Sequence, residues 1–260
     1  MPRGSLVVVG TGIRIGNQCT IEARHHIEAA DVVFEVVGDQ LAQEFLRSLN
    51  ANVVSLQHLY GRDRARSDTY AAMVETIVAA VKDGKRVCAA FYGHPGVYVY
   101  PSHESIRRVR EAGLEAEMLP AVSADACVFA DLGFDPGWIG CQSFEATDFV
   151  VNARKFDPTA VLMLWQLAVV GDRTLRVFES DPRRIALLAE VLMEDYPPDH
   201  LVKVYCAATL PMGEAQVETL PLSRLAEAEI TQESTLIVPP LGEAKPSPAR
   251  LALIEARLSA

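Results

Sequence analysis

The stretch SLVVVGTGIRIG, residues 5–16, indicates the fold because a β-branched apolar run stops there at a glycine-rich loop. Ser5–Gly10 has the pattern of a buried strand, and Thr20 can cap a helix over residues 20–30. The apolar run DVVFEVV at residues 31–37 predicts the next strand. A strand, a helix and a strand in this order predict a right-handed crossover between parallel strands.

The alternation continues through the first half of the chain. Further strands are expected at NVVSL (52–56), RVCAAFY (86–92) and LEAEMLP (114–120), with helices at 67–82, 102–112 and 124–131. Ser67 or Asp68 is the expected N-cap of the long helix, which would place Tyr70 in its first turn. We therefore expect a mainly parallel sheet in this half.

Apolar runs in the second half are short and closely spaced. Strands are expected at 159–165, 201–208, 216–222 and 234–240, with one helix at 181–196 and an amphipathic helix at the C-terminus. The hairpin-length connections indicate a mixed sheet. The chain is therefore predicted to form an N-terminal α/β lobe over residues 1–121, a second α/β lobe over 122–242 and a tail over 243–260.

The composition is that of an ordinary globular protein, with 50% hydrophobic and 22% charged residues. The formal charge of −10 argues against a nucleic-acid-binding surface. The five cysteines are scattered without a C-x-x-C pair, which is typical of inert thiols in a reducing compartment. With no apolar run of roughly 18 residues and no signal-peptide pattern, we expect a cytoplasmic protein without a membrane partner.

The loop GTGIRIG stands where a dinucleotide-binding fingerprint would, after a strand and before a helix. Its glycines at 10, 12 and 16 are one residue too far apart for G-x-G-x-x-G, and no G-K-[ST] follows. The pattern therefore favours a tight turn that packs helix on strand over a Rossmann cofactor site.

The stretch FYGHPG, residues 91–96, places two glycines around a proline at the end of a buried strand. Such a turn lets backbone groups approach a ligand closely, although a plain turn has the same pattern. His94 has no second histidine or carboxylate at ligand spacing, so no metal site is expected.

The stretch HLYGRDRARSDTY, residues 58–70, carries Tyr60, Arg66 and Tyr70 near the start of the long helix. A guanidinium beside a phenol would lower the phenol pKa and hold its oxygen in place. A solvated helix start explains the same spacing.

Together these stretches resemble the tetrapyrrole-methylase superfamily of S-adenosylmethionine-dependent enzymes, and within it the borosin peptide backbone α-N-methyltransferases of the omphalotin type. The resemblance covers residues 5 to about 240 and is carried by VVGTGI, FYGHPGVYV with PSH, MLPAVSAD, FADLGFDP, GCQSFEATDF, LMLWQ, YCAATLP and STLIVPP. It implies the two-lobed α/β fold of class III S-adenosylmethionine methyltransferases, with a mainly parallel N-terminal sheet and a mixed C-terminal sheet.

The resemblance also implies the residues of the site. Tyr60, Arg66, Tyr70 and Tyr92 would be catalytic, with Tyr92 between methyl donor and acceptor. The residues expected to contact S-adenosylmethionine, which would leave as S-adenosylhomocysteine, are Tyr92, His94, Val97, Val99, Ser123, Ala124, Gln166, Tyr205, Ala207 and Thr235.

A peptide nitrogen is a poor nucleophile because its lone pair is delocalised into the carbonyl group. Its methylation requires hydrogen-bond donors on the carbonyl oxygen, removal of the N–H proton and in-line placement of the nitrogen. We assign Arg66 and Tyr60 to the carbonyl oxygen and Tyr70, assisted by Arg66, to proton removal. The sequence is equally compatible with these roles exchanged.

Fused borosin proteins carry their substrate peptide at their own C-terminus as an apolar core segment. This chain ends in ARLALIEARLSA, residues 249–260, which lacks such a core. We therefore expect a separately encoded precursor peptide that is methylated in trans, although a chain cut short would look the same. The resemblance implies a homodimer, and Gln57 stands where omphalotin-type enzymes have a further tyrosine.

Other functions compete with this interpretation. A tetrapyrrole carbon methyltransferase would not call for the Tyr60, Arg66 and Tyr70 set, and a catalytically silent peptide-binding module would not need to retain it. A ribosomal RNA ribose methyltransferase of the same superfamily is disfavoured by the acidic charge.

Overall fold

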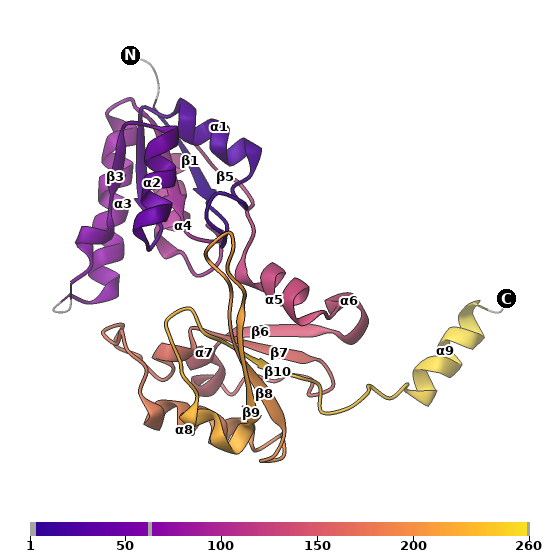
Figure 1. The fold of residues 1–260 in the computed structure, drawn as a ribbon. Coiled ribbons are helices and arrows are strands. Elements are labelled where there is room, and N and C mark those ends of the chain that lie inside the picture. The colour runs from indigo at the N-terminus through magenta and orange to yellow at the C-terminus, as the bar shows by residue number, and fades with distance from the viewer. Residues whose placement is uncertain (1–3, 62–63, 259–260) are drawn as a thin grey trace. The chain divides into compact units, whose positions relative to one another are not determined.

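The structure is a computed structural model that describes residues 4–61 and 64–258. The chain forms two compact α/β units (Figure 1). The first unit takes the chain up to Gly133 and adds Asp172–Val177 and Cys206–Gln216. The second takes Phe134–Gly171, Phe178–Tyr205 and the chain from Val217 onward. The lobe limits expected at residues 121 and 242 stay a prediction.

The first unit is built on a sheet of five strands in the order β3-β2-β4-β1-β5. The strands are β1 Ser5–Gly10, β2 Val32–Val36, β3 Val53–Ser55, β4 Arg86–Phe91 and β5 Glu115–Met118. All of these strand pairs are parallel. The mainly parallel N-terminal sheet predicted from the alternation is therefore confirmed.

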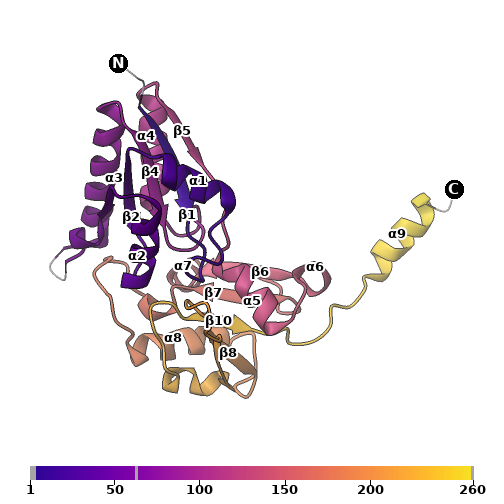
Figure 2. The same cartoon turned by 45° about the horizontal axis from the view of Figure 1, so that its top comes forward.

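Helices cover both faces of this sheet (Figure 2). They are α1 Ile21–Ala29, α2 Gln40–Leu49, α3 Arg66–Lys82 and α4 Tyr100–Glu111. α5 Ala124–Leu132 follows β5 in the chain and belongs to the same unit. On β1, Val9 belongs to the core under α1 and α2, whereas Leu6 and Val8 belong to the core under α3 and α4. Because successive strand residues point to opposite faces, one apolar strand supplies both cores.

The helix caps show where local sequence decides an end. Thr20 caps α1 as predicted, since its hydroxyl accepts a hydrogen bond from the Ala23 N–H at 3.0 Å. Asp39 caps α2 in the same way through the Ala42 N–H at 2.9 Å, although α2 was not among the expected helices.

The start of α3 differs from the prediction. The helix begins at Arg66 after Ala65, and neither Ser67 nor Asp68 is its N-cap, so that prediction was wrong. The physical reason is a partner distant in sequence: the Arg66 N–H donates to the Leu175 carbonyl oxygen at 2.9 Å. A backbone acceptor thus takes the place of a capping side chain at the helix end.

The second unit is built on a sheet in the order β6-β7-β10-β8-β9. The strands are β6 Cys141–Glu145, β7 Val161–Trp165, β8 Leu201–Cys206, β9 Gln216–Pro221 and β10 Thr235–Val238. β6 pairs with β7 in parallel, and β10 pairs with β7 and β8 in antiparallel fashion. The predicted mixed sheet is confirmed, with β6 as a strand that the sequence analysis missed.

The remaining helices lie in the second half of the chain. They are α6 Pro136–Ile139, α7 Ala146–Val151, α8 Pro182–Leu192 and α9 Pro248–Leu258, with 3-10 turns η2 Leu167–Val169 and η3 Leu222–Glu227. α8 packs Ile185 and Leu188 into the core that contains Leu164 of β7. The expected C-terminal helix is present as α9, which buries no residue. Along the described parts of the chain, every helix is too short or too polar to cross a membrane.

The core of the second unit provides a test of the fold. Leu164 is fully buried, whereas Leu187 on α8 is 46% exposed. We expect Leu164→Ala to lower the free energy of unfolding by about 2–5 kcal/mol, because it removes buried surface and leaves a cavity. The matched change Leu187→Ala should cost less than about 1 kcal/mol. Urea denaturation measures both, and equal losses would contradict the assigned core.

Candidate active site

Two loops meet at the carboxyl ends of β1 and β4. The Gly93 N–H donates to the Gly12 carbonyl oxygen at 3.0 Å, and the Gly12 N–H donates to the Gly93 oxygen at 3.3 Å. The Tyr92 N–H in turn donates to the Val36 oxygen, at the end of β2, at 3.1 Å. The glycine loop and the YGHPG turn therefore lie together at the carboxyl end of the parallel sheet, where α/β folds bind ligands.

Gly10 allows this contact because no side chain fits there. A Cβ on Gly10 would lie 2.1 Å from the Gly93 carbonyl oxygen and 2.6 Å from the Ala121 Cβ. Gly12 and Gly93 adopt positive φ angles of +73° and +67°, which glycine adopts without strain. The glycines thus serve loop-to-loop packing, which explains why their spacing departs from a dinucleotide fingerprint.

The turn after β4 is held by its own hydrogen bonds. The Val97 N–H donates to the His94 carbonyl oxygen at 3.1 Å, and the Gly96 N–H donates to the His94 Nδ1 atom at 2.9 Å. An accepting Nδ1 leaves Nε2 as the proton-bearing nitrogen of the neutral ring. Val97 remains 40% exposed, and Val99 ends the turn as the residue before α4.

The other predicted donor-site residues of the first unit come from two further segments. Ser123 is 9% exposed and precedes α5, and Ala124 is the first residue of that helix. The Ser123 hydroxyl donates a short hydrogen bond to the Asp125 carboxylate. Ala207 lies in the Cys206–Gln216 segment, which the Ile15 N–H joins to the glycine loop through the Thr209 oxygen at 2.9 Å.

In the second unit, three predicted residues lie at one end of the mixed sheet. Tyr205 on β8 pairs with Thr235 on β10, and these side chains are 1% and 3% exposed. Gln166 follows β7 directly and has a left-handed backbone, with φ +56°. The end of β7 and the start of β10 are neighbours because Leu164 pairs with Leu236. The structure therefore groups these three residues within their own unit.

The aromatic side chains predicted to be catalytic form a cluster in the first unit. The rings of Tyr60, which follows η1 (Gln57–Leu59), and Tyr70 on α3 meet edge to face with centroids 6.4 Å apart. Tyr100 on α4 extends the cluster, with its centroid 6.3 Å from that of Tyr70. Sequence analysis did not assign this tyrosine to the site, because only tertiary packing brings α4 next to α3.

Tyr60 is set to keep its proton. Burial raises the pKa of the Tyr60 phenol well above its ordinary value, the hydrogen bond with Tyr70 raises it further, and Arg66 opposes the shift. A phenol with a raised pKa is a hydrogen-bond donor at neutral pH, and its partner here is Tyr70.

Arg66 is a largely buried cation. Its side chain is 12% exposed, and its Nη2 atom lies 3.4 Å from the Asp172 Oδ2 atom. Its Nε atom is buried and makes no hydrogen bond to any described residue. Arg66 and Tyr70 are four residues apart on α3 and therefore share one face of the helix.

Asp172 is the part of the site that sequence analysis missed. Its Oδ1 atom accepts from the Thr174 N–H at 2.8 Å and hydroxyl at 2.6 Å, and its Oδ2 atom accepts from the Arg176 and Val177 N–H groups, each at 3.0 Å. The pattern Asp-x-Thr indicates such a turn. No local signal could pair it with Arg66, which is 106 residues away.

These hydrogen bonds fix the charge of Asp172. Burial by itself would raise the pKa of the carboxyl group, but the bonds from Thr174, Val177 and Arg176 outweigh it and lower the pKa to about 2. The carboxylate is therefore ionised throughout the neutral range.

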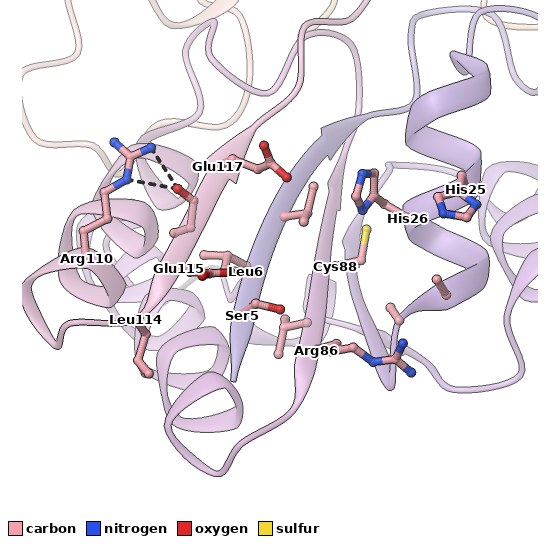
Figure 3. Close-up of a pocket in the computed structure, with 15 residues that line it drawn as sticks. Ser5, Leu6, His25, His26, Arg86, Cys88, Arg110, Leu114, Glu115 and Glu117 are labelled. Atoms are coloured by element: carbon pink, nitrogen blue, oxygen red, sulfur yellow. Dashed lines mark hydrogen bonds between the residues drawn. The ribbon is translucent and has the colours of Figure 1, made fainter. Parts of the chain in front are cut away.

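A hollow of about 680 Å³ lies at the other end of the parallel sheet (Figure 3). It is lined by Ser5, Arg86 and Glu115, the first residues of β1, β4 and β5. The Arg110 guanidinium at its rim is already bonded to the Ala116 carbonyl oxygen, at 2.8 and 3.0 Å. Its lining, as far as the chain is described, includes none of the predicted site residues.

Metal-ligating side chains do not gather in the described residues. Within 4–61 and 64–258, no group of three or more histidine, cysteine, aspartate or glutamate side chains could hold an ion. Cys88 behaves as a core residue, since it is 1% exposed and burial raises its thiol pKa to about 12.

The loop contact predicts the effect of a single methyl group. Gly10→Ala should lower the free energy of unfolding by about 1–3 kcal/mol, because the new Cβ meets the Gly93 backbone and cannot move aside cheaply. Gly242→Ala is the matched control, since no atom lies within 4 Å of its added Cβ. Thermal and urea unfolding of the two variants should differ, and a harmless Gly10→Ala would contradict the close approach.

Asp172 predicts a pH dependence of stability. Its pKa is lowered from 3.8 to about 2 on folding. Its stabilising contribution to the free energy of unfolding is therefore present above about pH 4 and is lost as the pH falls towards 2. The contribution is about 2 kcal/mol, from the size of the shift. The wild type should therefore lose its advantage over Asp172→Asn between pH 4 and 2, as measured by urea unfolding. A constant difference over that range would contradict this assignment.

Comparisons with known proteins agree with these features. Residues 5–226 match the family model described as Tetrapyrrole (Corrin/Porphyrin) Methylases. A uroporphyrin-III-C-methyltransferase from Thermus thermophilus has the same fold, with a TM-score of 0.65 at 18% identity over 92% of this chain and 93% of the other. The cobalt precorrin-4 methyltransferase CbiF superposes with a TM-score of 0.68 at 16% identity, covering 92% and 97% of the chains.

Three further relatives are more similar in sequence. The methyltransferase/ribosomally synthesized cyclic peptide dendrothelin A precursor of Dendrothele bispora is 39% identical over 91% of this chain and 58% of its own length. The corresponding type I borosin precursor of Coprinopsis marcescibilis is 39% identical over 91% and 62%. The omphalotin A precursor of Omphalotus olearius is 37% identical over 91% and 58%.

The chain thus spans about three fifths of the length of these curated relatives. The resemblance to borosin methyltransferases inferred from the sequence motifs is confirmed by their names and identities. The predicted two-lobed fold of class III methyltransferases is confirmed by the structural neighbours. Because the family model covers most of the chain and the fold agrees with it, this chain belongs to the tetrapyrrole methylase family.

Proposed function

We propose that this chain is an S-adenosylmethionine-dependent methyltransferase that α-N-methylates backbone amides of a separately encoded precursor peptide. The observation that carries the proposal is the buried Arg66 guanidinium, whose Nε has no partner among the described residues. An unpaired buried donor gains free energy from an acceptor such as a peptide carbonyl oxygen. The relatives, each named as a methyltransferase and peptide precursor, support the same acceptor class.

The first unit has features that suit a polar methyl donor. The packed glycine loops bring bare backbone to the carboxyl ends of β1 and β4. His94 adds a polar group within the second loop, and Ser123 follows two residues after Ala121, whose Cβ lies against Gly10. When bound, S-adenosylmethionine supplies an electrophilic methyl group on its sulfonium. We assign its binding to Tyr92, His94, Val97, Val99, Ser123, Ala124, Gln166, Tyr205, Ala207 and Thr235, with S-adenosylhomocysteine as the product that leaves.

We assign Arg66, Tyr60 and Tyr70 to the chemistry of the acceptor amide. Arg66 donates to the carbonyl oxygen and stabilises the negative charge that develops there when the nitrogen loses its proton. Tyr60 keeps its own proton and hydrogen-bonds to Tyr70. Tyr70 is thereby oriented and, as its phenolate, would take the amide proton and become a neutral phenol when the nitrogen accepts the methyl group. We assign Tyr92 to the position between donor and acceptor. Because the single O–H of Tyr60 is engaged with Tyr70, this proposal leaves the carbonyl oxygen to Arg66 and gives Tyr60 the role of orienting Tyr70.

The partners follow the same proposal. We place the substrate peptide on a separate chain, the enzyme in the cytoplasm and two copies of it in a homodimer. The first two are tested by methylation in trans and by fractionation of the source cells. The third is tested by light scattering of the purified protein, in which a monomer at all concentrations would argue against it.

Mass spectrometry tests the proposal directly. Purified protein is incubated with S-adenosylmethionine and short peptides that present an apolar Val/Ile/Gly-rich segment, and the products are fragmented. We expect successive additions of single methyl groups on backbone nitrogens. A methyl group on a tetrapyrrole carbon, with every peptide left unmodified, would establish the rival function. Cofactor binding by calorimetry without transfer to either acceptor would indicate a silent module.

Tyr70→Phe is the sharpest variant for the acceptor chemistry. It removes the hydroxyl assigned to proton removal and should lower kcat about 10²–10⁴-fold, as loss of a general base does. Binding of S-adenosylmethionine, followed by calorimetry, should be unchanged. Tyr196→Phe is the matched control, because the Tyr196 hydroxyl is buried without a partner among the described residues and lies in the core of the second unit. Unchanged turnover in Tyr70→Phe would remove this tyrosine from the mechanism.

A further inference from the structure

We propose that Asp172 is a positioning residue that holds the Arg66 guanidinium in its productive orientation for the carbonyl oxygen of the acceptor amide. The inference rests on the proposed function for its catalytic part. The pairing itself is a property of the first unit, to which both residues belong.

The first step of the argument is that Asp172 does not depend on Arg66. Both of its carboxylate oxygens are held by its own loop, through the Thr174 hydroxyl and the N–H groups of Thr174, Arg176 and Val177 at 2.6–3.0 Å. The bond to Arg66, at 3.4 Å, is the longest one on the carboxylate. The carboxylate is therefore a fixed point, and the mobile partner is the arginine.

The second step is that Arg66 depends on Asp172. Its side chain is 12% exposed, and Asp172, 1% exposed, is its ion-pair partner. A buried cation without a paired anion is strongly disfavoured and would swing towards water. The same loop also accepts the Arg66 backbone N–H through the Leu175 oxygen at 2.9 Å. Asp172–Val177 thus fixes this residue at both its backbone and its guanidinium group.

The third step concerns which donors remain. A guanidinium presents five N–H donors in a rigid plane, so one carboxylate contact on Nη2 orients the whole fork. The Nε donor, buried and unpartnered among the described residues, is left for an incoming oxygen. A carboxylate that bridged two of the guanidinium nitrogens would have used donors needed for substrate. The single contact therefore orients the arginine and leaves it able to bind.

A double-mutant cycle in kcat tests this coupling. We expect Asp172→Asn and Arg66→Lys each to lower kcat about 10–10³-fold with KM changed less than about 3-fold, because orientation is lost while charge at position 66 is kept. If Asp172 acts through Arg66, the double variant should be no more than about 3-fold slower than the slower single variant. Effects that multiply would overturn the proposal.

The controls separate this role from general stability. Asp157→Asn removes an equivalent Asp-x-Thr turn, since Asp157 accepts from the Thr159 N–H and hydroxyl at 2.9 and 2.7 Å, and it should leave kcat unchanged. Thr174→Val loosens the Asp172 carboxylate without changing its charge, and it serves if Asp172→Asn does not fold. It should lower kcat several-fold in the wild type and have no further effect in Arg66→Lys.

A spectroscopic readout keeps the two proposals distinguishable. The ¹⁵N-labelled Arg66 Nε–H signal, identified by its loss in Arg66→Lys, should shift in Asp172→Asn or in Thr174→Val and stay in place in Asp157→Asn. This measurement needs no peptide or methyl donor, so it stands even if peptide methylation is not observed. An Nε–H signal that is unmoved in the Asp172 and Thr174 variants would overturn the positioning role.

Discussion

The contact between the Gly10–Gly12 loop and the Gly93 turn is the constraint on which the rest of the first unit depends. Two reciprocal backbone hydrogen bonds join the loops, and the approach leaves no room for a Cβ at Gly10. The turn that follows β1 thereby fixes the orientation of the turn that follows β4. The residues between Tyr92 and Val99 that we assign to the methyl donor are positioned by this contact. The carboxyl end of the sheet therefore determines where that segment lies.

The proposed acceptor chemistry depends instead on an ion pair that is largely shielded from water. Arg66 and Asp172 form a pair in which the anion is satisfied by its own loop and the cation is not. A buried N–H donor without an acceptor lowers the stability of the unliganded protein, because it has lost its hydrogen bond to water. It is understandable in a site that must meet a developing negative charge, where a preoriented donor needs no rearrangement. The proposed proton transfer is assigned to the tyrosine cluster of the same unit.

How far the sequence could predict this structure depends on how local each determinant is. The strand alternation, the mixed second sheet and the Thr20 cap follow from neighbouring residues, and the structure has them. The α3 cap failed because the Leu175 oxygen, far along the chain, replaced a side chain. Asp172 was missed for the same reason: its turn is legible in the sequence, but its pairing with Arg66 exists only after folding. The family motifs supplied the other site residues, whose contacts with a methyl donor remain proposals.

The segments Asp172–Val177 and Cys206–Gln216 belong to the first unit, although Phe134–Gly171 of the second unit precedes the former and Phe178–Tyr205 also precedes the latter. During synthesis from the N-terminus, the parallel sheet can form early, but the end of α3 lacks the Leu175 acceptor and Arg66 lacks its carboxylate until much later residues leave the ribosome. The hydrogen bond from the Ile15 N–H of the glycine loop likewise cannot form before Thr209 has been synthesised. Because these closures span long stretches of chain, they are entropically late steps. The first unit can therefore complete its own contacts only after the chain has been synthesised as far as Gln216, which makes its final structure a late product of translation.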